Sequence, residues 1–110
     1  MEADQAVRAL GALAQEHRLA LFRQLVQAGP AGMAAGAIAA ALGLPNSSLS
    51  FHLAQLSAAG LIGQRRAGRS LIYSADFAAM DSLLSYLGAN CCGGADCSPA
   101  ALAANRRIAA

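Results

Sequence analysis

Lysine is absent from this chain of 110 residues, and all eight basic residues are arginines. A long apolar run is also missing, because charges or helix breakers interrupt every stretch of about 18 residues, the length that a membrane-spanning helix needs. The N-terminus carries Glu2 and Asp4 where a secretory signal would carry basic residues before an apolar core. We therefore expect a cytoplasmic protein that has no membrane-spanning segment.

Hydrophobic residues make up 56% of the chain, a high value that reflects abundant alanine. Alanine is small and forms helices readily, so this composition favours closely packed helices over a membrane segment. A length of 110 residues suits one compact domain. The core of so small a domain leaves little margin of stability, which a dimer would increase.

Basic residues gather at one point, although the net charge is only +2. Arg65, Arg66 and Arg69 fall within five positions. The planar guanidinium group can bind phosphate or the edge of guanine through two parallel hydrogen bonds. The same cluster is also typical of a solvated hairpin tip, so its place in the fold matters.

Apolar spacing and turn residues predict a mainly α-helical chain with one small β-hairpin. We expect helices over about 4–14, 16–28, 33–43, 46–60 and 77–87, and strands over 61–66 and 70–74 joined by a turn at Ala67 and Gly68. Pro45 ends the third helix, and Asn46 or Ser47 is expected to cap the fourth. Two short helices joined by a tight turn and followed by a hairpin form a winged helix-turn-helix.

In such a fold the fourth helix enters the major groove of DNA, and its outward side chains lie near the base edges. Leu49, Leu53 and Leu56 share one apolar face of this helix. The side chains expected near the groove are Ser47, Ser48, Ser50, Phe51 and Gln55. Serine and glutamine can read base edges, whereas Phe51 either contacts a thymine methyl group or packs in the core.

The hairpin is expected to reach the flanking backbone or the minor groove. Arg65, Arg66 and Arg69 would then contact phosphate groups or the minor groove. His52, on the fourth helix, is expected to act as a capping residue or to contact phosphate, rather than to bind metal.

The stretch from Asn46 to Ser74 resembles the ArsR/SmtB family of arsenic- and metal-responsive repressors. The resemblance is carried by the motifs His52-Leu53, Ala59-Gly60-Leu61, Gly68-Arg69 and Tyr73, and "EHRLALFRQL" (16–25) is similar to that family's second helix. It extends over roughly residues 5–90. It implies a homodimer formed mostly by the first and last helices, which binds a palindromic operator as a repressor and leaves it when a ligand binds. Residues 1–90 would form this winged-helix and dimerisation domain, and 91–110 a C-terminal cysteine site and tail.

The metal-binding motifs common in that family are missing. Many arsenic-responsive members have Cys-x-Cys at the start of the helix before the recognition helix, but 32–43 contain no thiol here. Zinc-sensing members use histidine and acidic residues on the last helix, which here offers Asp76 and Asp81 but no histidine. Instead, all three cysteines, Cys91, Cys92 and Cys97, follow the last helix, an arrangement similar to that of members whose sensing cysteines lie there.

Three clustered thiols in a reducing compartment favour a metal site or a redox sensor over structural disulfides. Trivalent arsenic or antimony is soft and binds three thiolates, so we expect Cys91, Cys92 and Cys97 to bind As(III), with Sb(III) as an alternative. Neighbouring cysteines need an irregular turn to point the same way, and Asn90, Gly93 and Gly94 permit one. Zinc with Asp96 as a fourth ligand, another soft metal and a thiol redox switch are the other possibilities.

A thiol enzyme is the contrasting class of function. Its nucleophile would need a base nearby or a phosphate-type loop to lower the thiol pKa. No histidine lies near the cysteines in sequence, and no glycine-rich loop follows a strand. We therefore expect a DNA-binding regulator and not an enzyme.

Overall fold

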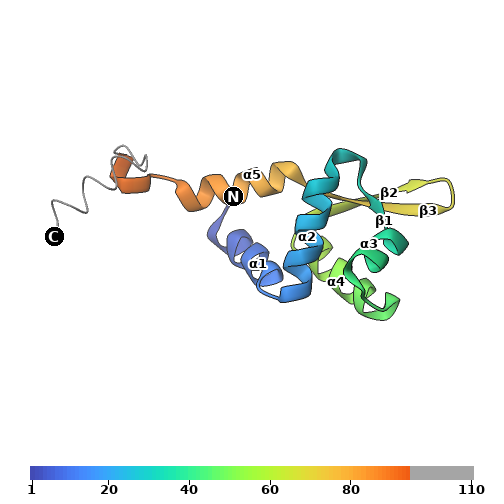
Figure 1. Cartoon of the computed structure of the whole chain (residues 1–110). Helices are drawn as coiled ribbons and strands as arrows, with labels where there is room; N and C mark the ends of the chain where they lie inside the picture. Colours follow the sequence, from blue (N-terminus) through green and yellow to red (C-terminus); the bar gives the residue numbers. More distant parts are fainter. Residues whose placement is uncertain (95–110) are drawn as a thin grey trace.

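The computed structural model describes residues 1–94 and shows a winged helix-turn-helix (Figure 1). The elements, in chain order, are α1 (Ala3–Leu13), α2 (Glu16–Ala28), η1 (Gly29–Ala31), β1 (Met33–Ala34), α3 (Ala35–Leu42), α4 (Asn46–Ala58), β2 (Ile62–Ala67), β3 (Ser70–Ala75), α5 (Phe77–Gly88) and η2 (Cys91–Gly94). The predicted fold class and the order of helices and hairpin are confirmed. Cys97 and the rest of the predicted tail lie outside the described residues.

Helix α2 lies at the centre of the core. Its Leu21 and Leu25 are completely buried, as is Ile38 of α3, and Leu49 and Leu56 of α4 are buried against them. Burying each leucine or isoleucine contributes about 1.5–3 kcal/mol. These contacts fix α4 against the body, so its opposite face is held outward.

The turn between α3 and α4 is set by Gly43 and Pro45. Gly43 has left-handed backbone angles (φ 66°, ψ 32°) and ends α3, as predicted. The predicted cap of α4 is wrong: Asn46 is already the first helical residue, and Pro45 stands at the cap in extended conformation without a side-chain cap. Proline lacks an amide hydrogen and its fixed φ suits the entry to a helix, so Asn46 is released from a capping role.

Three antiparallel strands form the wing, in the order β1-β3-β2. Strand β1, which the sequence did not predict, pairs Met33 with Tyr73. In the hairpin, Ala67 pairs with Ser70, so the turn consists of Gly68 and Arg69 rather than the predicted Ala67 and Gly68. Gly68 supplies the positive φ of 62°, and Arg69 lies at the tip.

Gly32, just before β1, is the one glycine within residues 1–94 where an added Cβ would meet other atoms. Its φ is +70°, and a Cβ there would overlap the carbonyl oxygen of Tyr73. Gly32→Ala should lower the free energy of unfolding by at least about 2 kcal/mol, because left-handed strain adds to a backbone clash. Chemical denaturation measures this. Gly36→Ala is the matched control: Gly36 lies in α3 with open space around it, so alanine there should stabilise by about 0.5–1 kcal/mol. Equal effects at the two sites would contradict the prediction.

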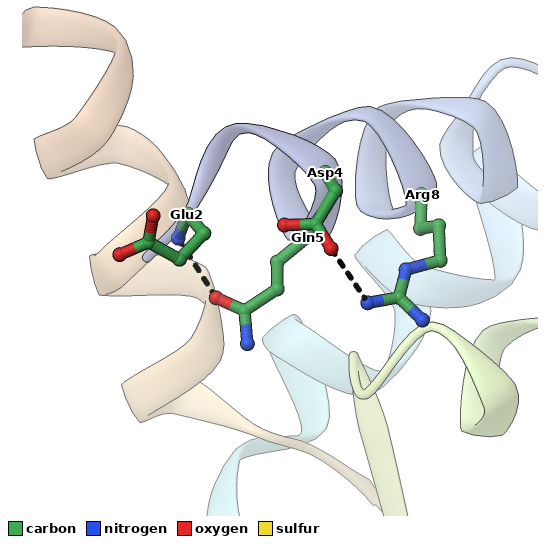
Figure 2. A network of polar contacts seen from close by, with 4 residues as sticks. All are labelled: Glu2, Asp4, Gln5 and Arg8. Carbon is green, nitrogen blue, oxygen red and sulfur yellow. Dashed lines mark hydrogen bonds and ion pairs between the residues drawn. The ribbon is translucent and has the colours of Figure 1, made fainter.

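Helix α1 begins beside α5, with polar contacts on its first turns (Figure 2). The Glu2 amide donates a hydrogen bond to Gln5 Oε1 at 2.8 Å. Asp4 and Arg8 form an ion pair at 3.6 Å, which is exposed and therefore worth little. On the outer surface of this helix, Val7 is 68% exposed although it is apolar.

Helix α5 runs from the wing past α1, so the wing and the end of α5 lie on opposite sides of the body (Figure 1). Leu83 faces the core and is buried. Leu84 and Leu87 are 61% and 57% exposed. No helix within residues 1–94 is both long and apolar enough to cross a bilayer.

Candidate nucleic-acid interface and thiol site

Helix α4 presents two different faces. The buried face contains Leu49, His52, Leu53 and Leu56. The opposite face contains Ser47, Ser50, Phe51 and Gln55, all exposed, while Ser48 is half-buried at the border. Phe51 is 57% exposed, so of its two predicted roles, core packing is wrong. Asn46, which was predicted as a possible cap, is also exposed and adds an amide to the face that would meet DNA.

His52 does not lie on this outer face, which corrects its predicted contact with phosphate. Its side chain is buried, with 8% exposure, and packs between helices α4 and α2. The ring centroids of His52 and His17 are 5.7 Å apart. Nδ1 of His52 has no hydrogen-bond partner within the described chain. A buried imidazole facing the core cannot reach the DNA backbone. Its contact with His17 joins residues far apart in sequence, so no local pattern predicts it.

The pKa of His52 is lowered from its ordinary value, first because burial disfavours the charged form and then because Arg18 and His17 repel a positive charge. A histidine with a lowered pKa contributes stability that is complete above the unfolded pKa of about 6.5 and is lost as pH falls through the folded pKa. We therefore expect the melting temperature to fall as the pH is lowered below about 6.5. His52→Gln should flatten this dependence in thermal unfolding followed by circular dichroism. An unchanged pH dependence in His52→Gln would show that other groups cause it.

The three wing arginines differ in their surroundings. Arg65 Nη2 donates a hydrogen bond to the carbonyl oxygen of Ala31 in η1 at 3.0 Å, so this side chain turns back to the body. Arg66 and Arg69 are exposed, and neither has a side-chain hydrogen bond or ion pair within residues 1–94. The wing therefore offers two guanidinium groups, at and next to its tip, that have no other partner within residues 1–94.

The first two cysteines lie in a left-handed turn just after α5. Asn90, Cys92 and Gly93 have φ values of 56°, 55° and 64°, so the predicted irregular turn is confirmed. The Gly93 amide donates to the Asn90 carbonyl at 2.8 Å and closes it. Both thiols are free and exposed, and their sulfur atoms are 3.9 Å apart.

This spacing fits one shared ion. At a bond length of about 2.3 Å, two sulfurs bound to the same ion can be at most about 4.6 Å apart. Within residues 1–94 no third histidine, cysteine or acidic side chain joins the pair. Asp76, one of the acids considered for zinc, instead caps α5 by accepting a hydrogen bond from the Ala79 amide at 2.9 Å. A third ligand from the same chain would have to follow residue 94, where Cys97 lies outside the described residues.

Comparison with known proteins gives concordant results. A family model described as a helix-turn-helix domain matches residues 13–65. The nodulation protein NolR of Rhizobium meliloti is 38% identical over 88 residues, which cover 80% of this chain and 67% of that protein. An ArsR-like transcriptional regulator from Rhodococcus sp. RHA1 superposes with a TM-score of 0.72 at 25% identity, covering 96% of this chain and 93% of its own.

A third relative bears on assembly. The DNA-binding domain of Mb0332 from Mycobacterium bovis, described as homodimeric and as a possible ArsR-family regulator, superposes with a TM-score of 0.62 at 31% identity. The match covers 79% of this chain and 81% of that domain. The similarity thus extends over the helices, the wing and most of the described chain.

Proposed function

Because the chain belongs to the ArsR family of winged helix-turn-helix transcriptional regulators, we propose that it is a metalloid-responsive repressor. Members of this family are DNA-binding regulators and not enzymes. In the proposal, a homodimer binds operator DNA and leaves it when trivalent arsenic binds Cys91, Cys92 and Cys97. Antimony(III) has the same preference for thiolate and is the second inducer.

The observation that carries this proposal is the pair of free thiols 3.9 Å apart. Holding Cys92 at φ 55° costs about 1–2 kcal/mol, because its Cβ approaches the following carbonyl. Backbone strain of this kind clusters at ligand sites, where it sets a geometry in advance. Here the strained turn turns two neighbouring thiols toward one another, and "GGAD" (93–96) gives the chain room to return Cys97 to them.

The dimer in this proposal uses the outer surfaces of α1 and α5. Apolar side chains are exposed on both, with Val7 and Leu10 on α1 and Leu84 and Leu87 on α5. Beside them, an apolar groove of about 450 Å³ runs between α2 and α5, lined by Leu19, Phe22, Val26, Met80, Leu83 and Leu84. The homodimeric relative from Mycobacterium bovis supports the formation of a homodimer. A two-fold dimer would also present two α4 helices to two half-sites.

Leu87→Glu should therefore raise the dimer dissociation constant at least about tenfold, since it places a charge in an apolar interface twice. Sedimentation over a range of concentrations measures this. Leu71→Glu is the control, because Leu71 is also an exposed apolar residue but lies in the wing. If both variants dimerise like the wild type, the interface lies elsewhere.

Release would follow from the position of the turn directly after α5. Binding an ion fixes η2 and changes the end of a helix in the proposed interface. The distance between the two α4 helices then changes, and the state that fits both half-sites loses population. Thiols must lose protons to bind, so the response weakens at low pH.

The test begins with selection of binding sites from random DNA duplexes, which also reports whether they are palindromic. Fluorescence anisotropy then follows the bound fraction, in a thiol-free reductant, as arsenite, antimonite or zinc is added. Release by arsenite and antimonite but not zinc supports the proposal. Release by zinc alone would mean that the inducer is another metal and not a metalloid. Release only by an oxidant, with loss of free thiol, would mean that the protein is a redox switch.

A further inference from the structure

Phe51 is an exposed aromatic residue in the middle of the outer face of α4. Its side chain is 57% exposed, comparable to Leu84 and Leu87 on α5. Those leucines belong to the proposed dimer interface. Phe51 does not, because α4 and the wing lie at the other end of the molecule from the end of α5 (Figure 1). Burying this exposed ring against a partner that meets α4 would be favourable.

The neighbours of Phe51 are polar and small. Ser47, Phe51 and Gln55 are spaced by four residues, so they form one stripe along the exposed face. Ser50 and Ala54 lie beside it and are also exposed. None of these five is charged, so the stripe has no group suited to phosphate as an ion pair. Its chemistry fits base edges, which offer hydrogen-bond donors, acceptors and one apolar group.

The ring of Phe51 also packs against the ring of its neighbour, His52. The His52 ring meets it edge-on, with centroids 5.7 Å apart and planes inclined by 65°. His52 is itself buried against His17 of α2. A supported ring loses less rotational freedom on binding than a free one, which favours a defined contact.

We infer that Phe51 determines sequence specificity by packing on the 5-methyl group of a thymine in the major groove. The inference rests on the proposed operator binding. The thymine methyl is the apolar group that base edges present in the major groove, and phenylalanine is among the side chains that contact it. Each half-site would then need a thymine at one fixed position, flanked by bases that Ser47, Ser50 and Gln55 read.

Replacing thymine by uracil in the selected operator removes this methyl and leaves every hydrogen bond of the base pair intact. One buried methyl is worth about 0.8 kcal/mol, so uracil at the contacted position should weaken wild-type binding about fourfold, and about fifteenfold when both half-sites carry it. Uracil at other thymines should have little effect. Scanning the thymines one at a time locates the position.

Phe51→Ala should weaken binding to the thymine operator about tenfold or more and lose the difference between thymine and uracil. Its fold should be intact, because the side chain is exposed and alanine favours helix. Thermal unfolding checks this. Ser57→Ala is the matched control, an exposed residue near the end of the same helix that should keep the full response to uracil.

The outcomes separate the inference from the proposed function. The inference is supported if Phe51→Ala loses the uracil effect while the wild type and Ser57→Ala keep it. If wild type and Phe51→Ala respond equally to uracil, or if no thymine is sensitive, the inference is wrong although operator binding stands. If no duplex is enriched in the selection, operator binding and the inference fall together.

Discussion

Replacing Cys91 or Cys92 by serine should raise the arsenite concentration needed to release operator DNA by at least about a hundredfold. Each replacement removes one of the two sulfur atoms that lie 3.9 Å apart. A serine hydroxyl is a hard ligand and stays protonated at neutral pH, so it cannot substitute for a thiolate toward a soft ion. A hundredfold change corresponds to about 2.7 kcal/mol, a modest value for the loss of one of three bonds to the ion.

Operator affinity without arsenite should stay the same in both variants, because the turn lies beyond α5 and far from α4 and the wing (Figure 1). Ser85→Ala on α5 serves as the control and should respond like the wild type. Anisotropy titrations in a thiol-free reductant make the comparison. A normal arsenite response in Cys91→Ser would remove the basis of the proposed inducer.

Cys97→Ser gives a different kind of result. If it fails to respond as well, three thiolates bind the ion. If it still responds while Cys91→Ser and Cys92→Ser do not, two thiols suffice, and the inducer is a species such as a methylated arsenical.

Replacing both Arg66 and Arg69 by alanine should weaken operator binding several hundredfold at about 0.15 M salt. Both side chains are exposed, and neither has an ion-pair partner in the described part of the chain. Each phosphate contact contributes about fivefold at this salt concentration through counterion release, and a dimer would make four such contacts. The loss should be similar for all DNA sequences, because phosphate contacts carry no sequence information.

The salt dependence gives a second readout for the same variant. The slope of log K against log salt should become shallower by about 3.6 in the dimer. Arg8→Ala removes one charge on α1, far from the wing, and should leave the slope unchanged. If the slope does not change in the double variant Arg66→Ala/Arg69→Ala, the wing does not contact DNA phosphates and the prediction is wrong.

Sequence patterns predicted the helices well and the smallest elements poorly. Helix α2 has the predicted bounds, since its apolar stripe stops where Gly29 and Pro30 break the pattern. Strand β1 has two residues within an alanine-rich run, which is too short for any alternation to be visible. Its existence depends on pairing with β3, a contact between distant parts of the chain.

His52 and Phe51 show why the site was only partly predictable. Leu49, His52, Leu53 and Leu56 follow helical spacing, so position 52 belongs to the buried face whatever residue stands there. The polarity of histidine suggested an outward position for His52, and the geometry of the helix decided against it. For Phe51 the predicted position near the groove and the alternative in the core were both open, and the helix places the side chain on the exposed face. The turn after α5 was predicted from Asn90 and its glycines, but the positive φ of Cys92 was not.

Few side chains of α5 are buried against its own protomer, and this has a thermodynamic consequence. This helix has 12 residues, of which Leu83 is buried and Phe77 and Met80 pack partly buried against the core. Isolated helices of this length are marginal in water, so in the proposed dimer the outer half of α5 would depend on the partner subunit for its order. The thiol turn begins where that half ends. In the proposed dimer, ion binding and subunit association would therefore be thermodynamically linked, and the apparent affinity for a metalloid would change with protein concentration.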